Sequence, residues 1–329
     1  MRTRTYLVFS IVMAIGVAAP TNTHAQVWDD PAKAAAEDPD FKVQGEFEGT
    51  IKDAEGKPVK VGGQVIALGD HKFRCVGYPG GLPGAGWIQE EDKVQAEATM
   101  VDGKAEFIFE DHKGVVHADG TAIIYDKASG EKIGSLKRIE RKSPTLGAKA
   151  PEGAVILFDG TRQTFEKNWN NGAKMTDDGL LTQGATSKPT FQAFTLHIEF
   201  RLPYQPKARG QGRGNSGLYM QGRYETQMLD SFGLEGKHNE CGGIYSVKAP
   251  DVNMCLPPLQ WQTYDVDFTP AKFDDSGKKI ANARMTVKHN GVVIHDNVEV
   301  PKSTTASPKK EGPDPGPIYL QNHGNPVRY

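Results

Sequence analysis

The 329-residue sequence has few cysteines, no strong excess of charge and no long apolar run with helical spacing. Its 39 Lys and Arg residues nearly balance its 41 Asp and Glu residues, giving a formal net charge of −2. This balance argues against a nucleic-acid or membrane-surface partner. The absence of a Cys-x-x-Cys spacing or a clustered His–Cys set excludes the usual zinc sites.

Glycine and proline, in contrast, are plentiful, with 37 and 21 residues. Together with the missing helical periodicity, this composition is typical of many short strands joined by turns. The length suffices for two domains and a sizeable core. We therefore predict an all-β protein with two domains.

The N-terminus has the pattern of a secretory signal peptide, which we place at residues 1–25. Two arginines precede the apolar core Leu7–Ala19, and Thr23-His24-Ala25 resembles a cleavage site before Gln26. The apolar run is too short for a transmembrane helix. We expect a mature protein in the periplasm or outside the cell, with no membrane contact after signal cleavage.

An oxidising compartment changes how the three cysteines are interpreted. Cys241 and Cys255 bracket one short segment, so we expect them to form a disulfide. Closing a loop of about 15 residues stabilises a protein by roughly 3 kcal/mol in the chain-entropy view. Cys75 is left over and is predicted to be a buried thiol.

Composition divides the mature chain into four parts. Residues 26–40 form a polar lead-in, and residues 41–136 alternate as a small all-β domain. Residues 137–152 have few large apolar side chains and form the expected linker. Residues 153–329 form the second domain.

In the first domain, the glycine-rich stretch Tyr78–Trp87 (YPGGLPGAGW) is too irregular for a regular element. Its two aromatic rings are suited either to stacking on a sugar or to packing within the protein, and both interpretations stay open.

The second domain contains the clearest alternation of the chain. In residues 194–202 (FTLHIEFRL), apolar and polar side chains point to opposite faces, which indicates a half-buried antiparallel strand. Residues Met285–Asp296 predict a β-hairpin around Asn290-Gly291, a dipeptide favoured in type I′ turns. Several such strands without intervening helices indicate a β-sandwich.

The densest run of functional side chains is Gly212–Ser231. Strand alternation places Arg223, Glu225 and Gln227 on one face, and a one-residue bulge after Gln227 would return Asp230 to that face. Two neighbouring carboxyl groups about 5–5.5 Å apart suit hydrolysis of a sugar bond. The alternative is an ordinary solvated strand face.

Two further patterns concern possible sites. Residues 212–217 match G-x-G-x-x-G, but a strand rather than a helix is expected to follow, so no dinucleotide site is predicted. His323, beside Gly and Asn near the end of the chain, is a candidate acid or base, or alternatively a surface residue. Glu225 and Asp230 could offer oxygen ligands to Ca²⁺, but no loop is spaced for such an ion, and we expect no cofactor.

Several segments resemble the 3-keto-disaccharide hydrolase family of secreted bacterial proteins. They are residues 215–231 (NSGLYMQGRYETQMLDS), 241–268 (CGGIYSVKAPDVNMCLPPLQWQTYDVDF), 289–296 (HNGVVIHD) and 318–329 (IYLQNHGNPVRY). The resemblance covers residues 153–329. It implies a concanavalin A-like jelly-roll sandwich of the lectin/glucanase type that acts on a small sugar substrate.

The same resemblance also limits which reaction mechanisms are expected. Laminarinase-type β-glucanases of this fold carry E-x-D-x-x-E on the catalytic strand, whereas the present row is Glu225, Gln227 and Asp230. An amide in the middle argues against displacement by a carboxylate and favours elimination and hydration of a 3-keto-glycoside. Expected catalytic residues are Glu225 or His323 as the base and Asp230 as the partner acid. Expected substrate-binding residues are Asn215, Tyr219, Arg223, Gln227 and Gln321.

Two other functions remain open at this point, because a fold does not fix a function. The first is a non-catalytic, lectin-like module whose shallow groove would be lined by Tyr219, Tyr245 and Trp261. The second is an interaction role at the bacterial surface, with a purely structural sandwich.

Overall fold

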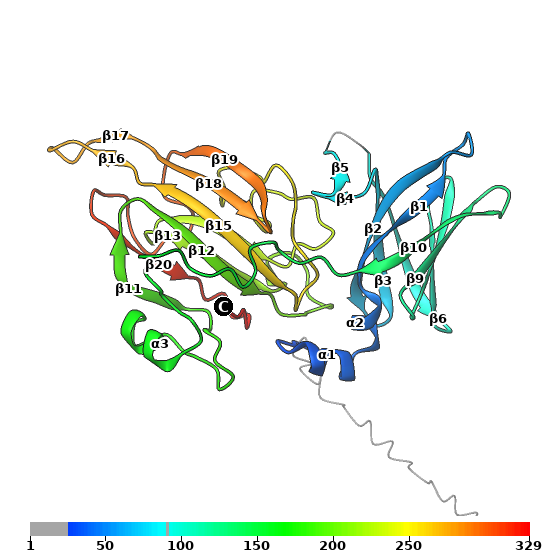
Figure 1. Cartoon of the computed structure of the whole chain (residues 1–329), viewed down its shortest axis with the longest axis horizontal. Coiled ribbons are helices and arrows are strands. Elements are labelled where there is room, and N and C mark those ends of the chain that lie inside the picture. Colours follow the sequence, from blue (N-terminus) through cyan, green and yellow to red (C-terminus); the bar gives the residue numbers. More distant parts are fainter. Residues whose placement is uncertain (1–25, 90–91) are drawn as a thin grey trace, which may run out of the picture.

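An eight-stranded antiparallel barrel forms the first domain of the computed structural model, which describes residues 26–89 and 92–329. The predicted signal peptide lies outside the described residues. The barrel lies on the right in Figure 1, and two short helices cover its lower end. In barrel order the strands are β1 (Gly45–Lys52), β10 (Lys132–Ile139), β9 (Thr121–Asp126), β8 (His112–His117), β7 (Lys104–Ile108), β6 (Val94–Val101), β3 (Lys72–Pro79) and β2 (Pro58–Gly69).

The barrel interior is filled by the inward-facing residues of alternating strands. Phe47, Phe73 and Phe107 are fully buried there. The two helices are α1 (Pro31–Glu37) and α2 (Pro39–Val43). Each begins with an Asp N-cap followed by proline, a pairing that favours helix initiation.

The second domain is a sandwich of two four-stranded antiparallel sheets, on the left in Figure 1. The predicted all-β jelly-roll class is confirmed. One sheet has the order β11 (Ala185–Phe191), β20 (Gly316–Leu320), β13 (Asn215–Met220) and β14 (Tyr224–Leu229). The other has the order β12 (Phe194–Arg201), β15 (Trp261–Thr269), β18 (Ala283–His289) and β19 (Val292–Val300). Minor elements are α3 (Arg162–Asn168), η1 (Gly210–Gly212) and the strand pairs β4 (Leu82–Pro83)–β5 (Gly86–Trp87) and β16 (Lys272–Phe273)–β17 (Lys279–Ala281).

The predicted hairpin around Asn290-Gly291 is confirmed. It joins β18 to β19, and both turn residues have positive φ, 50° and 81°, as a type I′ turn requires. This hairpin carries two fully buried histidines, His289 and His295. Burial lowers the pKa of His289 to about 3 and that of His295 to about 4, so both side chains are neutral at pH 7.

The two domains share apolar contacts. Tyr204 of the sandwich is fully buried in the barrel-side cluster, where its ring lies 5.3 Å from that of Trp28. Phe232 packs in a second cluster with residues of β2 and β3. The stretch Tyr78–Trp87 belongs to this second cluster: Tyr78 is buried and contacts Trp87 edge-on at 5.3 Å. Its rings therefore pack within the protein.

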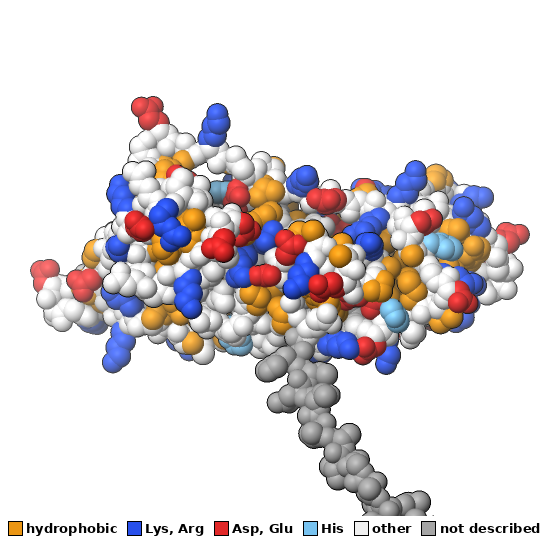
Figure 2. Space-filling view, turned by 90° about the horizontal axis from the view of Figure 1, so that it is seen from below, with side chains coloured by type: hydrophobic (Ala, Val, Ile, Leu, Met, Phe, Trp, Pro, Cys, Tyr) orange, Lys and Arg blue, Asp and Glu red, His pale blue; other side chains and the backbone are white. Residues whose placement is uncertain are grey.

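The chain passes from the barrel to the sandwich along the outer face of the β12–β15–β18–β19 sheet. Ser143 bonds the hydroxyl of Thr263 at 2.6 Å, and Thr145 donates to Asp265 at 2.8 Å. These bonds fix the connecting segment against β15. Lys and Arg side chains are interspersed with Asp and Glu side chains on the face shown in Figure 2.

The expected disulfide between Cys241 and Cys255 is absent, because both residues are free, buried thiols. Cys241 Sγ lies 3.2 Å from the Tyr264 hydroxyl, and Cys255 Sγ lies 3.6 Å from the Leu229 carbonyl oxygen. Burial raises the pKa of the Cys255 thiol. The two thiols hydrogen-bond to each other without being joined, and the prediction rested on sequence spacing, which does not determine the geometry between two sulfur atoms. No helix among residues 26–89 and 92–329 has the length and apolar character needed to cross a membrane.

Candidate functional site

The site lies on the outer face of the β11–β20–β13–β14 sheet, opposite the sandwich core. Gln221-Gly222, both with positive φ, turn the chain from β13 into β14. Beyond β14, residues 242–245 continue the sheet: Tyr245 N donates to the Glu225 carbonyl, and Gln227 N donates to the Gly243 carbonyl. The predicted site stretch is thus a hairpin flanked by two further segments, rather than one strand.

The register aligns side chains in rows across this sheet. Tyr319 pairs with Tyr219, Tyr219 pairs with Glu225, and Tyr245 follows at the edge. The next row contains Gln321, Gly217, Gln227 and Gly243. One row is therefore aromatic and acidic, and the next combines two amides with two glycines.

Glu225 is the central group of the site and is 2% exposed. Its Oε2 accepts a hydrogen bond of 2.8 Å from the Tyr219 hydroxyl, which in turn accepts one of 3.2 Å from the Gln321 amide. Burial raises the pKa of Glu225 to about 8, although the Tyr219 hydrogen bond opposes this shift. The carboxyl group is therefore largely protonated at pH 7 and becomes a base stronger than an ordinary carboxylate at higher pH.

Gly217 makes room for this carboxyl group. A Cβ atom at Gly217 would lie 2.1 Å from Glu225 Oε1, so any side chain there would displace the acid. The side-chain hydrogen bond of this carboxyl group among the described residues is made by Oε2 and not by Oε1. Oε1 is thus available to a ligand above the glycine.

An amide cluster adjoins the acid along the strands. Asn215 Nδ2 donates to the backbone and side-chain oxygens of Gln211, at 2.8 and 3.2 Å, and Gln227 Nε2 donates to Gln211 Oε1 at 3.1 Å. Asn215 is 1% exposed, and its Oδ1 has no partner among the described residues. A buried acceptor without a donor is costly, so Asn215 is placed to accept a hydrogen bond from a bound hydroxyl group.

The loop at residues 301–315 covers the other side of Glu225. Thr304 Oγ1 accepts a hydrogen bond from Glu225 N at 2.9 Å, and the Tyr219 hydroxyl lies 3.0 Å from the Thr305 carbonyl oxygen. Arg223, predicted to bind substrate, instead donates to the carbonyls of Lys310 and Asp314, each at 2.8 Å. Arg223 anchors the loop because its guanidinium is engaged by backbone oxygens.

The expected position of Asp230 is wrong. The β13–β14 ladder runs from Asn215–Leu229 to Met220–Tyr224 without a shift, so no bulge follows Gln227. Alternation consequently leaves Leu229, and not Asp230, on the face of Glu225. Asp230 is 1% exposed and accepts a hydrogen bond of 2.7 Å from Arg213 Nε, an ion pair that gives it a structural role.

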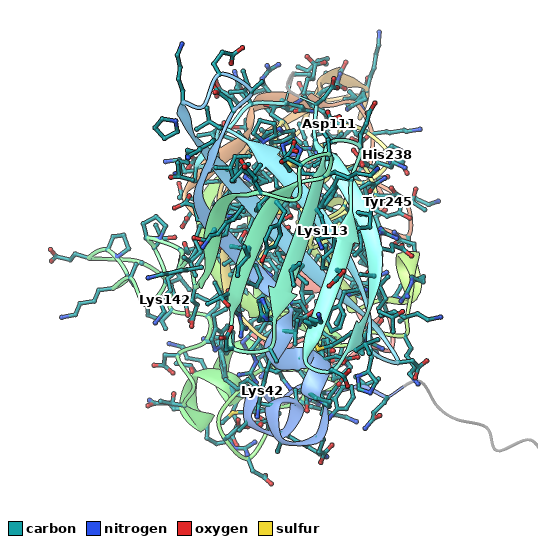
Figure 3. All side chains as sticks on the ribbon, turned by 90° about the vertical axis from the view of Figure 1, so that its right-hand side faces the viewer. Lys42, Asp111, Lys113, Lys142, His238 and Tyr245 are labelled. Atoms are coloured by element: carbon teal, nitrogen blue, oxygen red, sulfur yellow. The ribbon has the colours of Figure 1, made fainter. Side chains whose placement is uncertain are left out.

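His323 lies in the loop after β20, two residues beyond Gln321, and its side chain is exposed. Tyr245, at the sheet edge, is half-buried, and Figure 3 labels it on the same side of the molecule as His238. Trp261 does not join Tyr219 and Tyr245, since it begins β15 in the other sheet. The aromatic groove expected for a lectin is therefore not assembled here.

Sequence reasoning missed several residues of the site. Tyr319 lies two residues before Gln321, which was expected to bind substrate, so its place on the same face was predictable by alternation. Gly217 was also predictable, because it lies close to the predicted strand in the sequence. Gln211 and Thr304 lie in loops without a periodic pattern, and no signal in the sequence assigned them to this site.

Taken together, the fold and site define a two-domain all-β protein whose sandwich carries a buried carboxyl group of raised pKa on a polar sheet face. Residues 153–329 match the sequence profile of the 3-keto-alpha-glucoside-1,2-lyase-like domain. This match spans more than half of the chain, and the chain belongs to that family. The resemblance noted in the sequence is confirmed.

Two solved structures are similar to this chain, and both are of proposed glycosyl hydrolases from Parabacteroides distasonis ATCC 8503. The first has 30% sequence identity and a TM-score of 0.48, with coverage of 54% of this chain and 81% of the other. The second has 18% identity and a TM-score of 0.37, with coverage of 53% and 89%. No match was found among curated proteins.

The buried ionisable groups predict how stability depends on pH. Below pH 6.5 only the unfolded chain protonates His289 and His295, whereas between pH 8 and 4.5 only the folded chain protonates Glu225. Between pH 6.5 and 4.5 the unfolded chain therefore holds one proton more. Stability should fall by about 1.4 kcal/mol per pH unit as the pH is lowered through this window. Urea unfolding at pH 6.5, 5.5 and 4.5 measures the slope, and a flat profile would contradict the assignment.

Proposed function

We propose that the sandwich cleaves the glycosidic bond of 3-keto-glycosides or 3-keto-disaccharides by elimination followed by hydration, after export from the cytoplasm. Family membership supports action on such sugars. The observation that carries the proposal is Glu225, a buried carboxyl group whose pKa is raised to about 8 and whose Oε1 lies above Gly217. A single strong base is what proton abstraction beside a ketone requires.

The reaction begins at C2, where the neighbouring C3 ketone makes the proton acidic. Glu225 takes this proton, the electron pair forms the C1–C2 double bond, and the C1–O bond breaks. The departing oxygen gains a proton, for which exposed His323 is the candidate donor. Water then adds to the double bond, with its oxygen on C1 and a proton returned to C2. The net reaction is hydrolysis without a carboxylate nucleophile.

The other groups bind and orient the sugar. Asn215 Oδ1 accepts from a hydroxyl group, and the Tyr219–Gln321 pair fixes the orientation of Glu225. Gln227 holds Gln211 within the amide cluster. Asp230 and Arg223 play no part in the chemistry, since the ion pair and the covering loop engage them.

The proposal is tested by incubating the protein with a 3-keto-disaccharide and with its unoxidised parent. We expect release of both halves from the ketone and at least 100-fold slower release from the parent. In deuterated water, the reaction should place deuterium at C2 of the released 3-keto sugar. The purified product, incubated with the protein for the same time, controls for exchange after cleavage. Equal cleavage of both sugars, or a product without deuterium, would refute elimination.

A further inference from the structure

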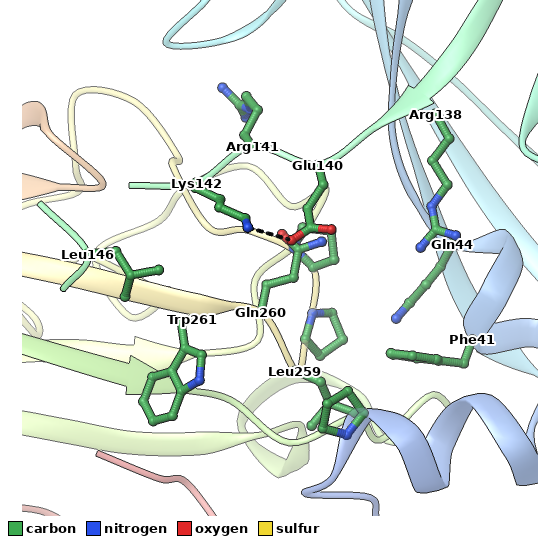
Figure 4. A pocket seen from close by; sticks show the side chains of 13 residues that line it. Phe41, Gln44, Arg138, Glu140, Arg141, Lys142, Leu146, Leu259, Gln260 and Trp261 are labelled. Atoms are coloured by element: carbon green, nitrogen blue, oxygen red, sulfur yellow. Dashed lines mark ion pairs between the residues drawn. The ribbon is translucent and has the colours of Figure 1, made fainter. Parts of the chain in front are cut away.

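A second recessed site lies between the barrel and the sandwich, remote from the sheet that carries Glu225. This cleft has a volume of about 390 Å³ and is shown in Figure 4. Its walls come from α2, the end of β10 and the following linker, and the loop that leads into β15. The lining residues used below are Phe41, Gln44, Arg138, Lys142, Gln260 and Trp261.

Two side-chain amides of the cleft lack partners. Gln44 is 1% exposed, yet neither its Nε2 nor its Oε1 has a hydrogen-bond partner among the described residues. Gln260 Oε1 is likewise buried without a donor. Figure 4 shows the side chain of Gln44 directed into the cleft from the barrel side. An unsatisfied buried amide destabilises a fold, so these groups are placed to bond a ligand that both donates and accepts.

Aromatic surface accompanies the amides. Trp261 is half-buried, and the guanidinium of Arg201 lies 5.1 Å from its ring centroid. Phe41 contributes a second ring from the barrel side (Figure 4). Rings next to amide groups suit a ligand with apolar C–H faces and hydroxyl edges, which is the chemistry of a sugar.

The charges around the cleft are largely neutralised within the protein. Arg141 donates two hydrogen bonds to Glu46, of 2.6 and 2.5 Å, and Lys142 lies 4.0 Å from Glu140. Arg138 donates to the Lys42 carbonyl at 2.6 Å. Two of these three cations have a carboxylate partner, so the cleft offers an anion only the guanidinium of Arg138.

We propose that this cleft between the domains is a second carbohydrate site, which binds a neutral saccharide without cleaving it. The amides of Gln44 and Gln260 bond the hydroxyl groups, while Trp261 and Phe41 contact the C–H face. The barrel thereby contributes half of a binding site. Binding here is independent of the chemistry proposed at Glu225, which lies on the opposite sheet of the sandwich.

The test is a calorimetric titration with glucose, maltose, cellobiose and trehalose, none of which carries a ketone at C3. We expect at least one of them to bind, and Gln44→Met and Trp261→Leu each to weaken its binding at least tenfold. Gln95→Met, on an exposed position of β6, is the matched control and should bind as the parent does. Gln44→Met should also raise the melting temperature, because it removes an unsatisfied buried amide.

Cleavage of the 3-keto-disaccharide at saturating concentration should be unchanged in Gln44→Met, so the two sites are assessed separately. If neither Gln44→Met nor Trp261→Leu changed the affinity for any of the four sugars, the proposal would be overturned. The proposal would also be overturned if none of the four sugars bound, whether or not the Glu225 site is active.

Discussion

We expect Glu225→Gln to lower kcat/KM for a 3-keto-disaccharide about 10²- to 10⁴-fold, the range typical of a lost general base. Glutamine keeps the size of the side chain and can still contact the Tyr219 hydroxyl, but its amide oxygen cannot take the C2 proton. The measurement is a progress curve of sugar release at pH 8. Deuterium exchange at C2 should be lost to the same extent, because both observations require removal of the same proton.

The same substitution should stabilise the protein at alkaline pH. The pKa of Glu225 is about 8 in the folded chain and 4.5 in the unfolded chain. Because the unfolded chain loses this proton first, the free energy of unfolding decreases as the pH rises from 4.5 to 8. Above pH 8 this loss of stability is complete and amounts to about 5 kcal/mol as an upper limit. Unfolding in urea at pH 9 should therefore require more denaturant for Glu225→Gln than for the parent.

Glu299→Gln, an exposed strand residue paired with Arg284, is the matched control and should change neither activity nor alkaline stability. If Glu225→Gln retained full cleavage, the acid–base role of Glu225 would be wrong. If activity fell while alkaline stability also fell, the loss would reflect damage to the fold instead.

We expect Asp230→Asn to destabilise the protein by about 3 kcal/mol or more, because it leaves the buried guanidinium of Arg213 without its counter-charge. Arg213 is 6% exposed, and its Nη2 already lacks a partner among the described residues. Equilibrium unfolding at pH 7 measures the loss. Asp296→Asn, at an exposed position of β19, provides the control and should have little effect.

Removing the charges of both Asp230 and Arg213 distinguishes a structural role of Asp230 from a catalytic one. The double substitution Arg213→Leu with Asp230→Leu should recover part of the lost stability, since no uncompensated charge remains buried. Below the unfolding transition, Asp230→Asn should retain its kcat. A large fall in kcat in a fully folded Asp230→Asn protein would restore Asp230 to the chemistry.

The correct sequence predictions rest on local patterns. Asn290-Gly291 determines its own turn, and the alternation of β12 appears within nine residues, so the sandwich class was accessible from the sequence. The shared face of Glu225 and Gln227 was predictable because it follows from the alternation of side chains along a single strand. Asp230 was misplaced because a bulge depends on the pairing of β14 with β13, which single-strand periodicity does not encode.

The remaining errors have related causes. The side-chain partners of Arg223 lie about 90 residues further along the chain, in a loop without regular spacing. Trp261 was grouped with Tyr219 although the strand order places them in different sheets. Closure of the first domain into a barrel depends on the β1–β10 pairing, which joins its two sequence ends. Each of these depends on contacts distant in sequence.

Tyr204 and Phe232 belong to the sandwich by sequence, yet both are buried against the barrel. The backbone of Trp28 also pairs with Tyr204 through two hydrogen bonds, of 3.1 and 2.8 Å. A polypeptide cut to residues 153–329 would expose both aromatic rings and lose this pairing. We therefore expect the sandwich of this chain, expressed without the segment that precedes it, to be less soluble than the full chain.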